Sequence, residues 1–268
     1  MPRPIRLGDS RGMHVLVLIS GVADPKWPLP SQPDASALEA HASRYAVLSP
    51  FDEAALELAL QLRDAEPATT IAALVSGPET LARKVAEWKL DRVQRLMLAD
   101  AAATDARNCA QALAAAIRPL AQDASLVLTG REFGDWDDGS VSALLARTLQ
   151  LPHVALTLGL DMADGQPRVT RQRGAVLERM RLARPALLSV TNDARNRLRH
   201  PLLKNVMAAR KIQIETLAVP ASAGTLRCTG LAPAAPPTRA ASCRMLTGSL
   251  EEQARALAEV LREEVVTA

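Results

Sequence analysis

Aromatic side chains are scarce in this chain of 268 residues, in which they make up only 2%. They are Trp27, Trp88, Trp136, Tyr45, Phe51 and Phe133. Single-stranded nucleic acid is bound largely by stacking of bases on aromatic rings, so this scarcity argues against such a function. Hydrophobic residues nevertheless make up 48% of the sequence. We therefore expect a globular protein whose core is built from Ala, Leu and Val.

Cysteines and long hydrophobic runs are also few. Cys109, Cys228 and Cys243 form no C-x-x-C pair and have no metal-ligand spacing, so we expect reduced structural thiols, no metal site and a cytoplasmic location. No apolar run approaches the ~20 residues that span a bilayer, so we expect no membrane-embedded segment. Residues 1–12 are basic and lack the apolar segment of a secretory signal. We expect them to be a disordered extension.

The common motifs of phosphate binding and hydrolysis are missing. The sequence contains no G-x-x-x-x-G-K-S/T loop, no G-x-G-x-x-G after its first apolar run, no H-E-x-x-H and no G-x-S-x-G. None of the four histidines has a neighbouring Cys or Ser that suggests a nucleophile. We therefore expect no catalytic side chain in this protein.

The first half of the sequence alternates short apolar runs with helical patterns. The apolar runs are residues 14–19, 70–75, 93–98 and 125–129. The helical patterns are residues 51–64, 79–90, 105–118 and 139–149. Such alternation is typical of a mostly parallel sheet with flanking helices. We therefore predict an α/β nucleotide-binding domain over residues 13–217, of the Rossmann-like or adenine-nucleotide α-hydrolase-like kind.

The pattern changes after Pro152. The next apolar runs are residues 153–160, 168–173, 176–182 and 186–191. They follow one another too closely for crossover helices, so we predict antiparallel additions at the sheet edge. Residues 218–247 are rich in Ala and Pro and should form an extended arm.

The last segment, residues 248–268, contains an amphipathic pattern over residues 250–265. Ser249 is placed to cap this helix, and Glu251 and Glu252 suit its first turn. We predict a helix that docks on another surface. The alternative is a helix that packs back on its own domain.

Two helix starts in the α/β domain are well marked. Ser49 can cap the helix that begins at Pro50, and Asp52 complements the helix dipole. Gly139-Ser140 begins another helix after a strand and an acidic loop. A helix start at the carboxyl end of a strand can bind a phosphate. The alternative there is an ordinary corner with Asp138 or Ser140 as the cap.

Five segments occur in an order that is familiar from one family. They are residues 15–26 (VLVLISGVADPK), 49–53 (SPFDE), 76–79 (SGPE), 125–152 and 205–211 (NVMAARK). Together, over roughly residues 13–265, they resemble the β subunit of electron-transfer flavoproteins. The resemblance implies a heterodimer with an α subunit that holds most of a redox-active FAD. It also implies a structural AMP in the β subunit, or a second FAD in some relatives.

The resemblance further implies a nucleotide pocket and a flavin contact. Carried over by position, the cofactor-binding residues are Leu18, Ser49, Pro50, Phe51, Asp52, Ser76, Asp135, Gly139, Ser140, Val141 and Ser142. Phe51 falls where the family approaches the flavin ring across the subunit interface. Its alternative role is that of a hydrophobic staple for its own helix.

The chain departs from the family pattern at several places. Ser140-Val141-Ser142 stands where the family commonly has Gln-Thr-Gly or Gln-Val-Gly, and Ser20-Gly21 stands where it has Lys-Arg. Gly174-Ala175-Val176 replaces Asp-Gly-Gly. These changes remove side-chain hydrogen-bond donors and leave less room for the backbone to approach a ligand. Of the implied properties, AMP binding is therefore the one that they affect most.

Residues 195–211 correspond to the family's recognition loop for flavin dehydrogenases. The resemblance gives partner-binding roles to Arg199, Leu203, Asn205 and Met207. Between Arg168 and Lys211 there are twelve Arg or Lys residues against two acidic ones, a charge that favours an acidic partner surface. The alternative is a solvated basic loop.

Three functions follow. The first is the β subunit of an electron carrier that accepts electrons from a flavin dehydrogenase and passes them to a membrane quinone oxidoreductase or another acceptor. The second is a stand-alone adenine-nucleotide-binding module or hydrolase, in which Asp135, Asp137 and Asp138 hold a metal and a phosphate. The third is an interaction subunit that keeps the heterodimer and has lost its nucleotide.

Overall fold

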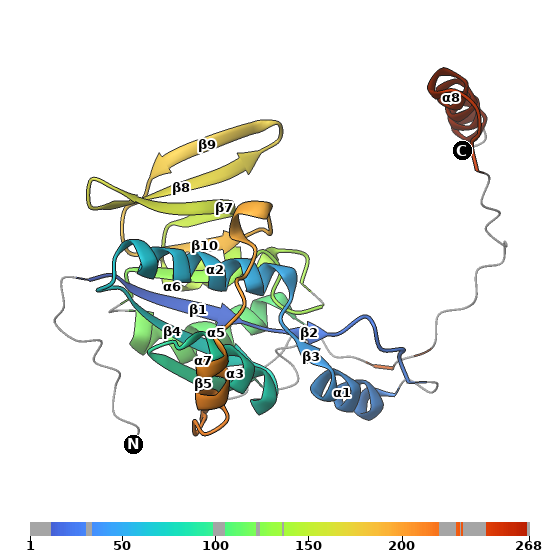
Figure 1. The fold of residues 1–268 in the computed structure, drawn as a ribbon. Coiled ribbons are helices and arrows are strands. Elements are labelled where there is room, and N and C mark those ends of the chain that lie inside the picture. The colour runs from blue at the N-terminus through green and yellow to red at the C-terminus, as the bar shows by residue number, and fades with distance from the viewer. Residues whose placement is uncertain are drawn as a thin grey trace. The chain divides into compact units, whose positions relative to one another are not determined.

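A computed structural model describes residues 12–30, 34–98, 105–121, 124–135, 137–219, 229–230, 232 and 245–266. Its contacts divide the chain into a first unit, Met1–Ala232, and a second, Pro233–Ala268. Each unit has its own internal contacts. The first contains the α/β domain and the second contains one helix (Figure 1).

In the described part of the first unit, nine strands form one sheet. In their order across it, they are β11 (Glu215–Ala218), β5 (Arg92–Met97), β4 (Thr70–Ser76), β1 (His14–Ile19), β6 (Leu126–Gly130), β10 (Ala186–Val190), β7 (His153–Ala163), β8 (Gln166–Arg173) and β9 (Val176–Arg181). Neighbours from β11 to β7 pair in parallel, whereas β7, β8 and β9 pair antiparallel. The predicted fold class is confirmed.

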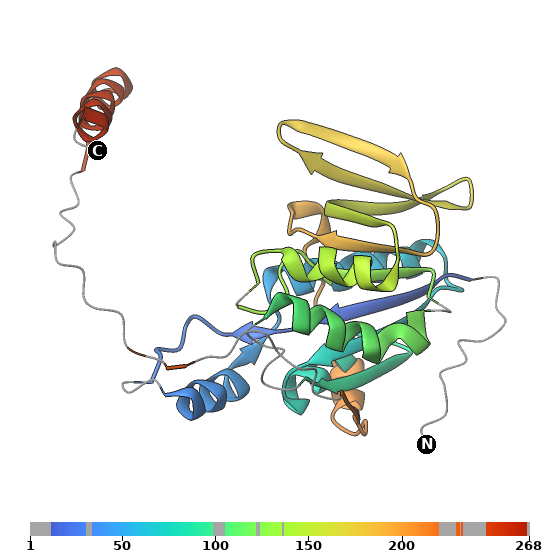
Figure 2. The same ribbon diagram turned by 180° about the vertical axis from the view of Figure 1, so that it is seen from behind.

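Helices cover both faces of the sheet, as Figures 1 and 2 show from opposite sides. One face packs against α2 (Pro50–Ala65) and α3 (Glu79–Val85), which is continued by the 3-10 turn η1 (Ala86–Trp88). The other face packs against α5 (Ala106–Ala121) and α6 (Ser140–Leu149). The side chains of β1 alternate between these two cores, because successive residues of a strand point to opposite faces. Burial on both faces explains why the central strands β1, β4, β6 and β10 are nearly continuous apolar runs.

The structure corrects the prediction for residues 186–191. This run forms β10, which is no edge addition but lies between β6 and β7 and is parallel to both. All five of its residues are buried, and a strand that is apolar on both sides belongs inside a sheet. The strand β7 likewise pairs in parallel with β10 on one side. Only the meander of β7, β8 and β9 is the predicted antiparallel edge.

Several short elements were not predicted. They are the antiparallel pair of β2 (Val22–Ala23) and β3 (Ala46–Val47), the helices α1 (Ala35–Arg44) and α7 (Leu203–Ala209), the turn η2 (Ala194–Asn196) and the strand β11. The strand β11 extends the sheet by pairing with β5. Its sequence, ETLA, has neither the length nor the apolar character of a recognisable strand.

The second unit contains α8 (Leu250–Val266), which confirms the predicted helix. The cap is reciprocal, because the Glu252 N–H donates to Ser249 Oγ over 3.3 Å and the Ser249 N–H donates to Glu252 Oε2 over 2.7 Å. Residues 1–11 of the predicted extension and most of the predicted arm lie outside the described residues. The docking role of α8 stays a prediction.

Candidate functional site

The predicted nucleotide-binding residues gather at the carboxyl edge of the central strands. In the register of the sheet, Leu18 of β1 lies between Leu74 of β4 and Thr129 of β6. The starts of α2 and α6 follow at the same edge, where the Cβ of Phe51 approaches Gly130. Such an edge is where ligands of open α/β sheets bind. The structure therefore brings the starts of α2 and α6 to the edge at which Leu18 lies.

The start of α2 is built around Asp52, whose side chain is fully buried. Its carboxylate accepts from the N–H groups of Ser20, Gly21 and Ser49 over 3.3, 3.0 and 3.1 Å, respectively. The Asp52 N–H donates in return to Ser49 Oγ over 3.0 Å, which completes a capping box. Burial raises the pKa of the Asp52 carboxyl, and these hydrogen bonds oppose that rise. Asp52 thus joins the ends of β1 and α2.

The start of α6 is capped by Asp137. One oxygen of its carboxylate accepts from the N–H groups of Gly139, Ser140 and Val141 over 3.0, 2.8 and 3.2 Å, and the other accepts from the Phe133 N–H over 2.9 Å. The predicted cap Asp138 contributes one bond, from the Ser140 N–H over 3.1 Å. Prediction of Asp138 or Ser140 as the cap was therefore incomplete. The left-handed φ of 93° at Gly139 turns the backbone so that Asp137 faces the helix amides.

The other predicted positions differ in their access to a ligand. Leu18, Val141 and Ser142 are buried, whereas Asp135 is exposed and Ser76 ends β4 half-buried. Phe51 is half-buried, and the guanidinium of Arg131 lies 4.8 Å from its ring centroid. Arg131 was not predicted to belong to the site. Its position directly after β6 was the available signal.

Cys109 lies in α5 as a free and buried thiol. Burial, together with the charge of Asp137, raises the pKa of this thiol to about 12. At pH 8 its thiolate fraction is then on the order of one in ten thousand, and the thiolate is the reactive form.

We expect Cys109 to resist iodoacetamide at pH 8 in the folded protein and to react once the protein is unfolded. The measurement is mass spectrometry of a Cys228→Ser, Cys243→Ser variant, in which Cys109 is the remaining cysteine. Fast labelling of the folded variant would contradict the buried placement.

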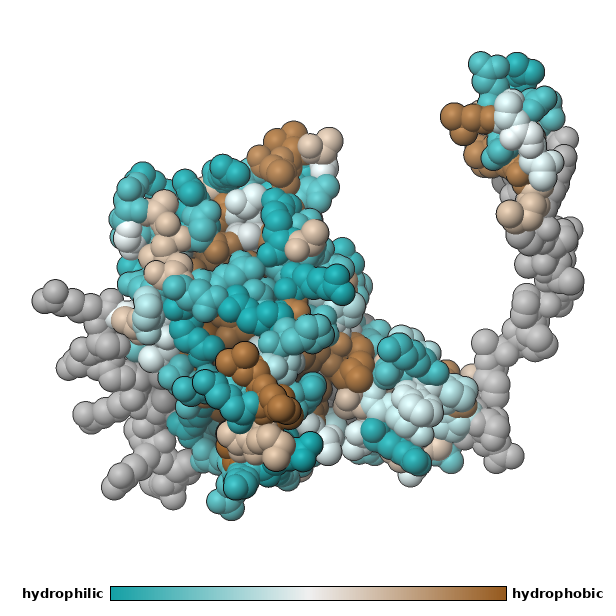
Figure 3. Space-filling view, viewed as in Figure 1, coloured by the Kyte–Doolittle hydropathy of each residue, from teal (hydrophilic) through white to brown (hydrophobic). Residues whose placement is uncertain are grey.

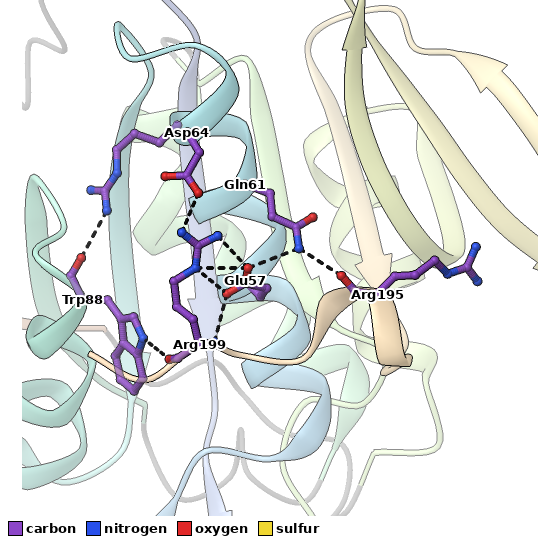
Figure 4. A network of polar contacts seen from close by, with 7 residues as sticks. Glu57, Gln61, Asp64, Trp88, Arg195 and Arg199 are labelled. Atoms are coloured by element: carbon purple, nitrogen blue, oxygen red, sulfur yellow. Dashed lines mark hydrogen bonds and ion pairs between the residues drawn. The ribbon is translucent and has the colours of Figure 1, made fainter. Parts of the chain in front are cut away.

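A second group of polar residues holds the segment before α7 against α2 (Figure 4). The guanidinium of Arg199 binds the buried Glu57 through Nε over 3.0 Å and Nη2 over 2.7 Å, and it binds Asp64 through Nη1 over 2.5 Å. The Arg199 carbonyl accepts from Trp88 Nε1 over 2.8 Å. The hydrogen bonds to Glu57 and, to a smaller extent, Asp64 raise the pKa of Arg199 above its ordinary value. Arg199, predicted to contact a partner, is thus already engaged within its own chain.

The short helix α7 and its flanks carry exposed apolar side chains. Leu203 is 77% exposed, and Leu202, Met207 and Ile212 are exposed as well. We call these four residues the α7 surface. Figure 3 shows hydrophobic residues gathered where Figure 1 places α7. Of the other predicted partner residues, Asn205 is half-buried.

Much of the positive charge between Arg168 and Lys211 is paired. Acidic side chains contact Arg168, Arg171, Arg173, Arg181, Arg195 and Arg199. Four of these acids, Asp161, Asp164, Glu57 and Asp64, lie outside that stretch of sequence. The net positive charge counted from the sequence therefore overstates the positive electrostatic field of this region, because the sequence does not show which ion pairs form.

Membrane-spanning helices and metal-binding clusters are both missing from the part of the chain that the structure describes. No helix among the described residues is long and apolar enough to cross a membrane. Within the same ranges, no three acidic, His or Cys side chains are arranged to hold a metal ion. The predicted metal site at Asp135, Asp137 and Asp138 therefore has no geometric support.

Comparison with known proteins identifies the family. The family model described as the electron transfer flavoprotein domain matches residues 39–222. The chain is 26% identical over 200 residues to the electron transfer flavoprotein subunit beta of Syntrophomonas wolfei, which covers 74% of this chain and 77% of that protein. It is 28% identical over 211 residues to the protein of that name in Mycobacterium tuberculosis, with 76% and 78% covered. The counterpart in Dictyostelium discoideum is 27% identical over 209 residues, with 76% and 80% covered. With this model matched over more than half of its length, the chain belongs to the electron transfer flavoprotein domain family, and the relatives named here are its β subunits.

Proposed function

We propose that this chain is the β subunit of a heterodimeric electron carrier. It pairs with an α subunit that holds FAD, receives electrons from a flavin dehydrogenase and delivers them to a membrane quinone oxidoreductase or another acceptor. No side chain of this subunit makes or breaks a bond in this function. The family supports the proposal, and the relatives carry the name of that subunit.

FAD supplies the reversible acceptance of electrons, and this chain supplies a surface that faces it. Phe51 and Arg131 fit that role, because the half-buried ring and the guanidinium 4.8 Å from it lie at the carboxyl edge of the sheet. An aromatic ring and a cation are suited to contact with a planar flavin and to tuning its electrostatics. The Phe51 ring is therefore suited to contact a flavin at the subunit interface, in addition to packing as a hydrophobic staple for α2.

The α7 surface is the observation that supports docking of a redox partner. Large apolar side chains that stand exposed beside one another mark interaction sites, and Leu203 is the most exposed of the four. Arg199 fixes the segment before α7, so this surface is presented in one geometry. A preformed surface loses less entropy on binding than a flexible loop.

We expect Leu203→Ala to weaken capture of the dehydrogenase at least about tenfold, which corresponds to the loss of one apolar anchor. The measurement is quantitative mass spectrometry of proteins cross-linked in cells to the tagged chain. The α subunit should be captured as before. Leu29→Ala, which truncates another leucine at 67% exposure, is the control. Equal dehydrogenase capture by both variants would contradict docking on α7.

The stand-alone hydrolase is the weaker candidate. It requires a metal at the acidic loop, and the Asp137 carboxylate there is occupied by backbone N–H donors. A carboxylate that caps a helix has few free lone pairs for a cation. Hydrolysis of ATP by the purified chain would revive this candidate.

A further inference from the structure

The AMP that the family implies needs unpaired backbone N–H groups. The first amides of a helix are suited to phosphate because they lack partners within the helix and carry the positive end of its dipole. At the candidate nucleotide site, the start of α6 is the helix start that a phosphate would use. Its fit to a phosphate therefore depends on whether those amides are free.

They are not free, because Asp137 takes them. The N–H groups of Gly139, Ser140 and Val141 all point to one oxygen of this carboxylate, at 3.2 Å or less. The second oxygen is held by the Phe133 N–H, at the other end of the same loop. The carboxylate thus has the charge, the donors and the place of a phosphate oxygen at a helix start.

The loop that carries Asp137 is also tied to a neighbouring strand. Gly134 donates its N–H to Ser20 Oγ over 2.7 Å, which ties the loop to the end of β1. The neighbouring amides of Ser20 and Gly21 donate to Asp52. A phosphate at this edge would therefore have to displace two internal carboxylates and would meet their charge.

The side chains leave little room as well. Ser142, at a position where the family commonly has glycine, is 97% buried, since its exposed fraction is 3%. A cavity of about 250 Å³ lies beside Pro50, but Glu53 and Asp193 line it. Ligand pockets usually measure about 300–1,000 Å³. This cavity is smaller than that range, and Arg197 lines it together with the two carboxylates.

We infer that Asp137 takes the place of the nucleotide phosphate, so that this β subunit carries no adenine nucleotide of its own. The Asp137 carboxylate itself joins the loop after β6 to the start of α6. The inference rests on the proposed function in one respect. If the α subunit holds FAD, that FAD is the one nucleotide of the complex.

The test is made on the complex that co-purifies with the tagged chain from its own cells. Nucleotides released by heat are separated by chromatography and counted per chain, and thermal melts are recorded with and without AMP and with and without inorganic phosphate. Asp137→Ala opens the amides of α6. Asp138→Asn, which alters a neighbouring carboxylate with a single bond to that helix, is the matched control.

We expect FAD but no stoichiometric AMP from the wild-type complex, and no change of its melting temperature with AMP. Asp137→Ala should gain several degrees from AMP or phosphate, because a ligand that binds only the folded state stabilises it. Asp138→Asn should behave as wild type. Close to one AMP per wild-type chain would overturn the inference. An Asp137→Ala complex that ignores both ligands would overturn the role of Asp137. Absence of FAD would count against the proposed function instead.

Discussion

Replacing Asp52 with alanine should lower the free energy of unfolding by about 3–5 kcal/mol. The substitution leaves the Ser49 Oγ cap of α2 in place but removes the carboxylate of the capping box, which strands the N–H groups of Ser20, Gly21 and Ser49. Each buried donor left without a partner costs about 1–3 kcal/mol. Chemical denaturation followed by circular dichroism measures the difference.

Glu53→Ala is the matched control for Asp52→Ala. Glu53 lies in the same first turn and is exposed, so its removal should cost less than about 1 kcal/mol through the helix dipole. Equal stability of the two variants would contradict the central place of Asp52.

The effect of Asp52 should also depend on pH. Burial raises the folded-state pKa of Asp52 above its ordinary value of 3.8, so the folded state binds more protons than the unfolded state between these two values. Stability contributed by Asp52 is therefore greatest below 3.8 and falls as the pH rises through the folded-state pKa. The difference in unfolding free energy between wild type and Asp52→Ala should therefore become smaller as the pH rises. Chemical denaturation at several pH values measures this difference.

Replacing Arg199 with alanine should cost about 1–3 kcal/mol of unfolding free energy. The loss of a buried ion pair costs more when one charge is left behind, and Glu57 is only 4% exposed. The upper end of this range of free energies is kept low because the Arg199 side chain is 40% exposed, so that solvent partly screens its charge. Hydrogen exchange should rise over residues 200–209, since Arg199 fixes the segment before α7.

A double-mutant cycle isolates this ion pair. Arg199→Ala combined with Glu57→Ala should be clearly less destabilised than the sum of the two single variants, because neither then leaves an unpaired partner. Strict additivity of the two substitutions would show that Arg199 and Glu57 do not stabilise one another. The same cycle separates an internal role of Arg199 from the partner contact that the sequence predicted.

The sequence predicted those parts of the fold that depend on local pattern. The strand β1 and the helix α2 were evident because burial on both faces and a capping box leave direct traces in the order of residues. The position of β10 was missed, because the pairing of a strand depends on the path of the chain between β9 and β10. The strand β11 was missed because β5 supplies its partner from far away in the sequence.

The candidate site was predictable in its location but not in its contacts. The segments that form it follow β1, β4 and β6, and the parallel order brings their ends together. The choice of Asp137 over Asp138 as the main cap depends on the turn at Gly139, a backbone angle that no spacing reveals. The pairing of Arg199 with Glu57 joins residues far apart in the chain and was likewise hidden.

The most direct test of the account is the FAD content of whatever assembles with this chain. The tagged protein is captured from its own cells, and its visible spectrum is recorded together with the masses of its subunits. The account predicts a complex of two different subunits in equal amounts, with flavin absorbance equal to one FAD per complex. A colourless protein that elutes alone, with no second subunit, would contradict the electron-carrier function.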